Sequence, residues 1–210
     1  MLLRSIPLGD FQANCYLLTD EKSGESLVID PGFYCEELEE FMKKNGVSQV
    51  KYILLTHGHM DHICGAPYFK EKYGGKIVIG EADAPILEEY HFLDGASSYR
   101  DSFRPCIADI IATDDLELYL GDIKITMIAT PGHITGEFCY IIEDMIFTGD
   151  VLFRESIGRT DLEGGNIFAL VKSLKRIRDL NVNFRVFPGH GEETSIAHES
   201  EFNRFYKALR

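Results

Sequence analysis

Short apolar runs separated by polar turns recur along most of the chain, and they predict β-strands joined by tight connections. Residues 15–20 and 26–30 flank the polar turn Glu-Lys-Ser-Gly, a pattern typical of a β-hairpin. Similar runs predict further strands at residues 50–55, 76–79, 116–120, 123–129, 138–142, 145–148 and 184–187.

Apolar residues at helical spacing lie between several of these runs. Leu38, Phe41 and Met42 indicate a helix over residues 35–45, which Gly46 ends. The same reasoning predicts helices over residues 61–73, 82–90, 166–180 and 195–208. Residues 91–113 show no clean period, so we expect an irregular segment that forms either a wall or lid over a substrate or a plain surface loop.

The order of these elements favours an α+β fold. In both halves of the chain strands come first and helices are inserted between them, which suits two packed sheets covered by helices better than a strictly alternating parallel fold. No low-complexity linker or repeat divides the sequence, and 210 residues suit one domain. We therefore expect residues 1–210 to form a single domain.

Composition and charge narrow the class of partner. The chain is 45% hydrophobic and 26% charged, as in ordinary globular proteins, and its 21 basic and 34 acidic side chains leave a net charge of −13. Such a surface repels phosphate backbones and anionic lipids, so neither nucleic acid nor a membrane is expected as a partner. No signal peptide or membrane span is evident, which predicts a cytoplasmic protein; its oligomeric state stays open.

The five cysteines do not suggest a thiolate metal site or a disulfide framework. Their number is odd and no two are spaced as Cys-x-x-Cys. Cys64 and Cys139 lie near the motifs described next, but we expect them to be small buried residues rather than ligands.

Ligand-type side chains follow the ends of several predicted strands, after one or two small or turn-forming residues. These side chains are His57, His133, Asp150 and His190, with Asp30 as a fifth, weaker case. Strand ends at one edge of a sheet bring together residues that are distant in the sequence, and Gly and Pro there let the backbone turn sharply. Asp30 could hydrogen-bond a ligand histidine or simply form an Asp-Pro turn.

The densest cluster is the segment His57-Gly58-His59-Met60-Asp61-His62. Residues two apart on an extended segment face the same way, so His57 and His59 can bind one cation, while Asp61 and His62 fall where a helix begins. The full set of candidate ligands is His57, His59, Asp61, His62, His133, Asp150 and His190. Seven ligands suit two metal ions with one bridging carboxylate, and imidazole and carboxylate without thiolate favour zinc, with iron or manganese as alternatives.

Three further polar residues are not expected to bind metal. His91 lies in the irregular segment and His198 in a helix, and we expect both to be solvated. Arg159 follows Asp150 closely enough to bind a substrate carboxylate, or else it pairs with a neighbouring acid such as Asp161 or Glu163.

In this order and spacing the blocks resemble the metallo-β-lactamase-fold hydrolase superfamily. The resemblance rests on Asp30, His57-x-His59-x-Asp61-His62, His133, Asp150 and His190 and covers nearly the whole chain. It implies a four-layer αβ/βα sandwich of two mixed β-sheets covered by helices, with the metals at one edge. It further implies a first metal held by His57, His59 and His133, a second held by Asp61, His62 and His190, and Asp150 as the bridge.

Within the superfamily the chain most resembles the short, single-domain glyoxalase II group. The supporting strings are Pro131-Gly132-His133-Ile-Thr-Gly, Phe147-Thr148-Gly149-Asp150, Gly158-Arg159-Thr160-Asp161 and Phe187-Pro188-Gly189-His190-Gly191. This resemblance implies hydrolysis of a thioester, typically S-lactoylglutathione to lactate and glutathione. About 20 residues follow His190, so the C-terminal helical region that helps two-domain members hold glutathione is not expected.

A binuclear hydrolase of this kind would use metal-bound hydroxide. Two ions about 3.5–4 Å apart lower the pKa of a bound water toward ~7, and the hydroxide attacks the thioester carbonyl. Asp61 and Asp150 are the residues expected to orient this nucleophile as well as bind metal.

Rival interpretations remain open. A persulfide dioxygenase of the same fold would use a single iron held by His57, His133 and Asp150, and the Gly158-Arg159-Thr160-Asp161 string also resembles that group. A β-lactamase is less favoured, because many of those enzymes place a thiolate where Asp150 stands. A purely structural metal site is disfavoured, since such sites are usually closed, four-coordinate and rich in cysteine.

Overall fold

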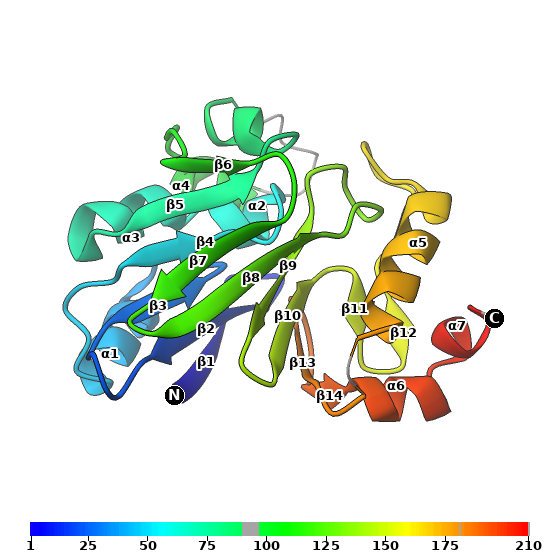
Figure 1. Ribbon diagram of the computed structural model, residues 1–210. Helices are drawn as coiled ribbons and strands as arrows, with labels where there is room; N and C mark the ends of the chain where they lie inside the picture. Colours follow the sequence, from blue (N-terminus) through cyan, green and yellow to red (C-terminus); the bar gives the residue numbers. More distant parts are fainter. Residues whose placement is uncertain (90–96, 181, 210) are drawn as a thin grey trace.

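The computed structural model describes residues 1–89, 97–180 and 182–209, and most of its strands form two six-stranded mixed sheets (Figure 1). The first sheet keeps the order of the sequence, with antiparallel pairing from β1 to β3 and parallel pairing from β3 to β6. Its strands are β1 (Leu2–Leu8), β2 (Ala13–Thr19), β3 (Ser26–Ile29), β4 (Tyr52–Leu54), β5 (Lys76–Gly80) and β6 (Ile110–Ala112).

The second sheet has the order β14-β13-β10-β9-β8-β7, and only its β10–β13 pair is parallel. Its strands are β7 (Leu116–Leu120), β8 (Ile123–Ala129), β9 (Phe138–Ile142), β10 (Met145–Gly149), β13 (Arg185–Pro188) and β14 (Thr194–Ser195). A small separate hairpin follows β10 and consists of β11 (Leu152–Phe153) and β12 (Ser156–Ile157).

The helices are short, and among those in the described residues none is long and apolar enough to cross a membrane. They are α1 (Glu36–Lys44), α2 (Met60–Ile63), α3 (Ala66–Tyr73), the 3₁₀ turn η1 (Ala84–Leu87), α4 (Ser97–Ser102), α5 (Ile167–Arg178), α6 (Ile196–Phe202) and α7 (Arg204–Lys207). In Figure 1, α5, α6 and α7 lie beside the second sheet, on the side away from the first.

Alternation along the strands sorts the buried side chains into three apolar layers. On β2, Tyr16 and Leu18 face the second sheet and pack in one cluster with Tyr140 and Phe147. Leu17 points the other way, into a cluster with Leu38 and Met42 of α1 and with side chains of α3.

The outer face of the second sheet is covered in the same manner. Cys139 and Ile146 lie in a third cluster with Leu170 and Leu174 of α5, and residues of α6 and α7 complete it. Helices, sheet, sheet and helices therefore form four layers, which confirms the predicted α+β sandwich of two mixed sheets.

Two predicted helices prove to be interrupted. The segment 61–73 divides into α2 and α3 at Gly65, where a Cβ atom would lie 2.1 Å from the carbonyl oxygen of Pro31. The segment 195–208 divides into α6 and α7 at Asn203, whose side chain accepts hydrogen bonds from the backbone N–H groups of Phe205 and Tyr206. In both places a specific tertiary or capping contact overrides a continuous apolar period.

Other differences between the predicted and the observed elements lie where the apolar periodicity of the sequence is weak. β1 was not predicted, although it pairs with β2 along its whole length. The helix predicted over 82–90 is only the η1 turn, and the segment 91–113, predicted to be irregular, contains α4 and β6 within its described part. Residues 90–96, including His91, lie outside the described residues, so the predicted solvation of His91 stays a prediction.

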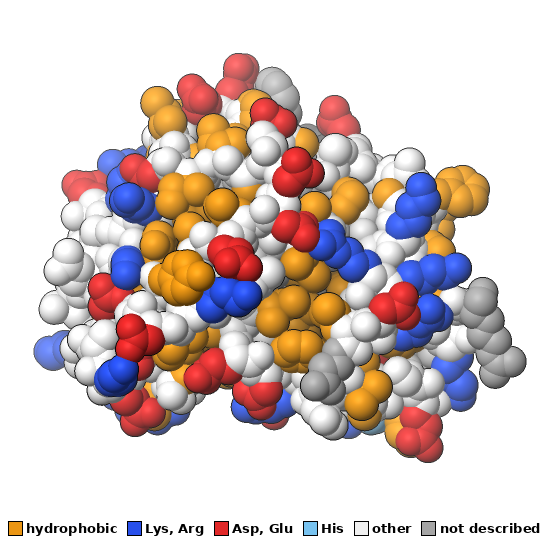
Figure 2. Space-filling view, viewed as in Figure 1, with side chains coloured by type: hydrophobic (Ala, Val, Ile, Leu, Met, Phe, Trp, Pro, Cys, Tyr) orange, Lys and Arg blue, Asp and Glu red, His pale blue; other side chains and the backbone are white. Residues whose placement is uncertain are grey.

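The surface charge is not gathered in one place on the face shown in Figure 2. Acidic side chains are spread among basic ones there, with apolar side chains between them. Several oppositely charged side chains of the described residues form exposed ion pairs, such as Nζ of Lys124 with Oε1 of Glu117 at 3.0 Å. Such exposed pairs contribute little to stability, because water and salt screen them.

Candidate metal centre

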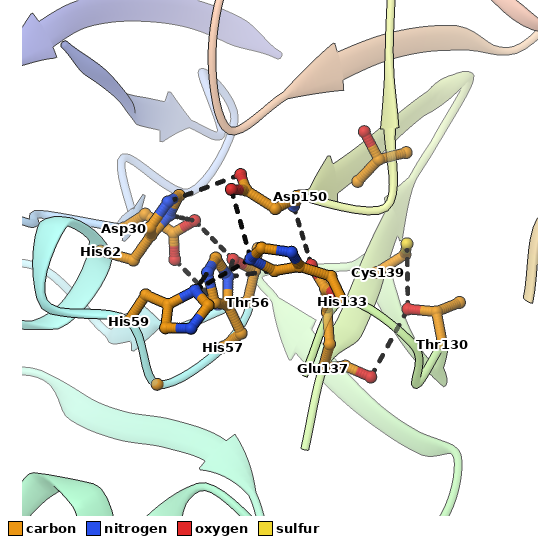
Figure 3. Close-up of polar contacts among 12 residues, drawn as sticks. Asp30, Thr56, His57, His59, His62, Thr130, His133, Glu137, Cys139 and Asp150 are labelled. Carbon is orange, nitrogen blue, oxygen red and sulfur yellow. Dashed lines mark hydrogen bonds and ion pairs between the residues drawn. The ribbon is translucent and has the colours of Figure 1, made fainter. Parts of the chain in front are cut away.

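The predicted ligands meet at the edge of the molecule where the strands of both sheets end. Asp30 directly follows β3 and His57 follows the parallel neighbour β4, while Asp150 and His190 follow the parallel pair β10 and β13. His133 lies in the loop between β8 and β9 and completes the group (Figure 3). The strand-end rule used above therefore holds in the structure, because parallel neighbours deliver their carboxyl ends to the same edge.

A first cluster consists of His57, His59 and His133. The Nε2 atom of His57 lies 3.0 Å from Nδ1 of His59, and Nε2 of His133 lies 2.9 Å from the same atom. Ligand atoms around a tetrahedral zinc ion would lie about 3.3 Å from one another, given zinc–nitrogen distances near 2.0–2.1 Å. The three imidazoles therefore converge at a spacing that suits one cation.

A second cluster consists of Asp61, His62 and His190. Oδ2 of Asp61 lies 3.2 Å from Nε2 of His190 and 3.6 Å from Nε2 of His62. Asp61 and His62 come from the short helix α2, which begins directly after His59. The sequence segment 57–62 thus contributes to both clusters, as its spacing predicted.

Asp150 lies between the two clusters. Its Oδ2 atom is 3.5 Å from Nε2 of His133 and 3.6 Å from Nε2 of His190, and its Oδ1 atom is 3.6 Å from Nε2 of His62. One carboxylate therefore reaches ligand atoms on both sides. The structure brings together all seven residues that the sequence analysis selected. They include the two groups that the resemblance implied, and a third group of His57, His62 and Asp150 overlaps both.

Two polar atoms at this point have no hydrogen-bond partner in the structure. Nε2 of His62 and Oδ1 of Asp150 are both buried without a hydrogen bond, and they lie 3.6 Å from each other. Leaving a buried polar group unpaired costs about 1–3 kcal/mol, so native proteins rarely do so without a reason. A cation between these atoms would satisfy both, and the donor set of imidazoles and carboxylates fits such an ion.

The histidine rings are held in defined orientations by acceptors outside the clusters. Nδ1 of His133 donates to the carbonyl oxygen of Arg159 at 2.8 Å, and Nδ1 of His190 donates to that of Phe11 at 3.0 Å. A carbonyl oxygen can only accept, so in the neutral form of both rings the Nε2 lone pair faces the centre. His190 also forms an isolated β-bridge with Ala13, which joins the N-terminal hairpin to the site.

Asp30 orients ligands of both clusters. It accepts hydrogen bonds from Nδ1 of His62 at 2.9 Å, from the hydroxyl of Thr56 at 2.7 Å and from the Thr56 N–H at 2.8 Å. Because the Thr56 hydroxyl donates to Asp30, its oxygen accepts from Nδ1 of His57, 3.0 Å away. Of the two roles considered for Asp30, the structure therefore shows the hydrogen bond to a ligand histidine.

Burial and charge act differently on the two clusters. Burial lowers the pKa of His57 well below its usual value, and burial together with nearby His133 lowers the pKa of His59 to about 3. Burial also acts to lower the pKa of His62, but Asp61, Asp30 and Asp150 outweigh it and raise that pKa to about 10. The second cluster therefore attracts positive charge strongly, whereas the low pKa values of His57 and His59 keep these two imidazoles of the first cluster neutral.

Glu137 is a buried acid beside the site that the sequence analysis missed. Its Oε1 atom accepts a hydrogen bond from the N–H of Asp150 at 2.8 Å and lies 3.8 Å from Nδ1 of His57. Burial, reinforced by the charge of Asp150, raises the pKa of this carboxyl well above its usual range. Glu137 precedes β9 instead of following a strand, so the strand-end rule could not select it.

Asp83 is a second buried acid that was missed. Its Oδ2 atom accepts from the N–H of Gly58 and its Oδ1 atom from the N–H of Gly136, each at 2.8 Å. Burial raises the pKa of Asp83 to about 6. Asp83 lies just beyond the end of β5, so the rule that selected Asp30 and His57 could have found it.

A cavity of about 1000 Å³ lies over the two clusters. Asp61, Asp150 and His190 are among its lining residues, and its apolar wall consists of Phe11, Met60, Ala82, Ile86, Ile134 and Leu162. Arg159 also lines it, but its exposed guanidinium makes two hydrogen bonds of 2.7 Å to Asp161. None of the described residues of the segment 97–113 lines this cavity, so a wall or lid formed by them is not supported.

The remaining candidates lie away from the clusters. Cys64 and Cys139 are buried and free, as predicted. His198, expected to be solvated, is instead half-buried and lies 3.0 Å from Oε1 of Glu155. Glu155 comes from the turn between β11 and β12, which packs beside α6 and was not predicted.

The sequence matches the family model described as the metallo-beta-lactamase superfamily over residues 8–190. An uncharacterized protein of Aquifex aeolicus is 35% identical over 209 residues, covering 98% of this chain and 97% of that protein. The probable metallo-hydrolase YqgX of Bacillus subtilis is 33% identical over 211 residues, with 98% and 97% covered. The hydroxyacylglutathione hydrolase GloC of Haemophilus influenzae is 32% identical over 214 residues, with 98% of each covered.

Solved structures give the same picture. The BLEG-1 B3 metallo-beta-lactamase superposes with a TM-score of 0.87 at 33% identity, covering 98% of this chain and 99% of that one. ETHE1 from Myxococcus xanthus superposes with a TM-score of 0.77 at 27% identity, with 97% and 84% covered. A di-iron-bound form of TTHA1623 superposes with a TM-score of 0.79 at 29% identity, with 96% and 99% covered.

Proposed function

This chain belongs to the metallo-beta-lactamase superfamily, and we propose that it is a binuclear metallohydrolase that cleaves an acyl thioester into an acid and a thiol. The observation that carries the proposal is the pair of ligand clusters with Asp150 between them. His57, His59 and His133 would hold the first ion, and Asp61, His62 and His190 the second. Asp150 would contact both.

The unpaired atoms support an ion beside His62 in addition to one held by the first cluster. A single cation in the first cluster would leave Nε2 of His62 buried without a partner, and so would a cation shared only by His57, His133 and Asp150. A second ion held by Asp61, His62 and His190 would satisfy that atom. The high density of carboxylates around His62 favours a divalent cation at this position.

The chemistry needed for hydrolysis would come from the ions, since a bound pair lowers the pKa of a coordinated water toward about 7. The residues of the chain would hold the ions and orient the attacking water and the substrate. Asp61 and Asp150 present carboxylate oxygens at the base of the cavity, where they can accept a hydrogen bond from an attacking water. The apolar wall beyond them limits access of bulk water to a bound acyl group. Water adds to the acyl carbon, and the carbon–sulfur bond breaks to release the thiol.

Relatives support a thioester as the substrate class. The matched GloC protein is named a hydroxyacylglutathione hydrolase, and the strings around His133, Asp150 and His190 resemble the glyoxalase II group. We therefore propose S-lactoylglutathione or a related acyl thioester as the substrate. Zinc is the proposed metal, and the di-iron form of TTHA1623 makes iron the first alternative to test, ahead of manganese.

The test combines metal analysis with a substrate panel. Purified protein should retain two equivalents of metal and hydrolyse S-lactoylglutathione or another acyl thioester, with free thiol as the readout. His59→Ala, which removes the atom shared by both short contacts in the first cluster, should abolish this activity. Turnover by chelator-treated, fully metal-free protein at the same rate would refute the proposal.

Two other activities are tested in the same panel. The likeness to ETHE1 and the Gly158-Arg159-Thr160-Asp161 string make persulfide dioxygenation by a single iron at His57, His133 and Asp150 a second candidate. One iron per chain with oxygen uptake on glutathione persulfide would establish that alternative. The likeness to BLEG-1 makes a β-lactam a necessary member of the panel.

A further inference from the structure

We propose that Asp83 is a positioning residue that fixes the relative position of the two loops that carry the first cluster. This inference rests on the proposed metal centre. His57 and His59 come from the loop after β4 in the first sheet, whereas His133 comes from the β8–β9 loop in the second. Contacts that cross from one sheet to the other are therefore needed to fix the distance between His133 and the other two histidines.

Asp83 makes such a contact with both of its carboxyl oxygens. The carboxyl group accepts one hydrogen bond from the N–H of Gly58, which lies between His57 and His59 in the sequence. It accepts a second from the N–H of Gly136, which lies in the loop of His133. The Asp83 side chain is only 1% exposed, so neither bond competes with bulk water. One buried carboxyl group therefore ties together the backbones that carry all three imidazoles.

Both partners of Asp83 are glycines, and the reason is space. A Cβ atom on Gly136 would lie 2.3 Å from Oδ1 of Asp83. A Cβ atom on Gly58 would lie 3.2 Å from Cβ of Asp83 and 2.7 Å from Cδ1 of Ile86. The absence of side chains at these two positions is what allows the carboxyl group to reach both N–H groups.

The carboxyl group is itself held in place by the turn that carries it. The N–H of Asp83 donates to the carbonyl oxygen of Gly80 at the end of β5, and its carbonyl oxygen accepts from Ile86 in η1. β5 pairs with β4 in the first sheet, so the turn is anchored beside the loop of His57. Asp83 thus transmits the position of the first sheet to the loop of His133.

Asparagine cannot replace this carboxyl group. An amide offers one accepting oxygen and one donating NH₂ group, so one of the two glycine N–H groups would face another donor. Residues that orient metal ligands from outside typically change metal affinity by about 10–100-fold when they are substituted. We therefore expect Asp83→Asn to weaken one metal equivalent by about 10–100-fold and to leave the other unchanged.

Asp20 provides a matched control. It is also a buried aspartate whose carboxyl oxygens accept two backbone N–H groups, those of Lys22 at 3.0 Å and Ser23 at 3.1 Å. It follows β2 at the end opposite to Ala13, and Ala13 is the residue that bridges to His190. Asp20→Asn removes the same kind of contact without touching the loops of either cluster.

The experiment measures retention of zinc by the full-length, zinc-loaded protein against chelators of graded strength. Wild type and Asp20→Asn should retain two equivalents of zinc. Asp83→Asn should lose one equivalent to a chelator whose zinc affinity is about 10–100-fold lower than the chelator needed for wild type. Its circular dichroism spectrum should be unchanged. Combining Asp83→Asn with His59→Ala should cause no further loss of zinc beyond His59→Ala, because both changes act on the same cluster.

Three results would overturn the inference. The first is wild-type retention of both equivalents by Asp83→Asn, and the second is loss of both equivalents together. Should Asp83→Asn fail to fold, Gly136→Ala decides, because its added Cβ displaces the same carboxyl group and should weaken the same single equivalent. Wild-type retention by Gly136→Ala is the third. A wild-type protein that retains no zinc, iron or manganese would refute the proposed function itself and is recognised before any variant is compared.

Discussion

The two ligand clusters lie side by side but are held by different physical means. In the first, imidazoles from two sheets are placed by hydrogen bonds to Thr56 and to the backbone, and by the contacts of Asp83 with both loops. In the second, carboxylates surround His62 and raise its pKa to about 10, so charge itself favours a cation there. The difference indicates that the first cluster depends mainly on geometry and the second mainly on electrostatics.

Removing the shared carboxylate should have the largest effect, because its oxygens lie within 3.6 Å of candidate ligand atoms of both clusters. Asp150→Ala should lower retention of both metal equivalents and reduce thioester hydrolysis by at least about 1000-fold, the scale on which a single essential catalytic group acts. Metal analysis and initial rates measure this, with circular dichroism as the control for folding. Retention of either equivalent at wild-type strength would contradict the bridging position.

Separate removal of one ligand from each cluster tests whether they behave as two sites. His59→Ala and His190→Ala should each lose one metal equivalent and keep the other, with activity reduced by about 100-fold or more. In His190→Ala the remaining ion is the one at the first cluster. If the carboxylates of the second cluster attract this ion at a distance, its retention should be weaker at high ionic strength than at low ionic strength. Two variants that both lose all metal would show a single coupled site instead.

Asp30→Asn should affect both clusters to a smaller degree. Asp30 contacts His62 directly and reaches His57 through the Thr56 hydroxyl, and an amide would place a donor against one of its three donor partners. We expect about 10–100-fold weaker retention of both equivalents, in contrast to the single equivalent expected for Asp83→Asn. Chelator competition on the two variants side by side measures the contrast, which disappears if Asp30 serves one cluster alone.

Arg159→Ala should have the smallest effect of this series. The guanidinium lines the cavity but is exposed and paired with Asp161, so water and salt screen the ion pair and it contributes little to stability. If it also binds a substrate carboxylate, KM should rise by about 3–10-fold while kcat and metal content stay unchanged. An equal KM for Arg159→Ala and wild type would leave the ion pair with Asp161 as its only role.

The convergence of the seven candidate ligands could be predicted because each stands in a recognisable sequence context. His57, Asp150 and His190 follow apolar runs and small turn residues, and strand ends deliver such residues to one edge. Glu137 was harder, because it precedes a strand and its carboxyl group binds a backbone N–H group, which carries no sequence signal. Asp83 does follow β5, so the same rule could have selected it. A similar limit applies to the fold, since the breaks at Gly65 and Asn203 depend on Pro31 and on capping contacts that no periodicity reveals.

The bridge between Ala13 and His190, together with the hydrogen bond from the Asn14 N–H to the Gly189 carbonyl oxygen, joins the beginning of the chain to its last ligand. A nascent chain emerging from the ribosome can order the first sheet early, but this contact cannot close until residues 189 and 190 have been synthesised. Closing so long a loop is slow, so acquisition of the full complement of ions is expected to be among the last events in biosynthesis.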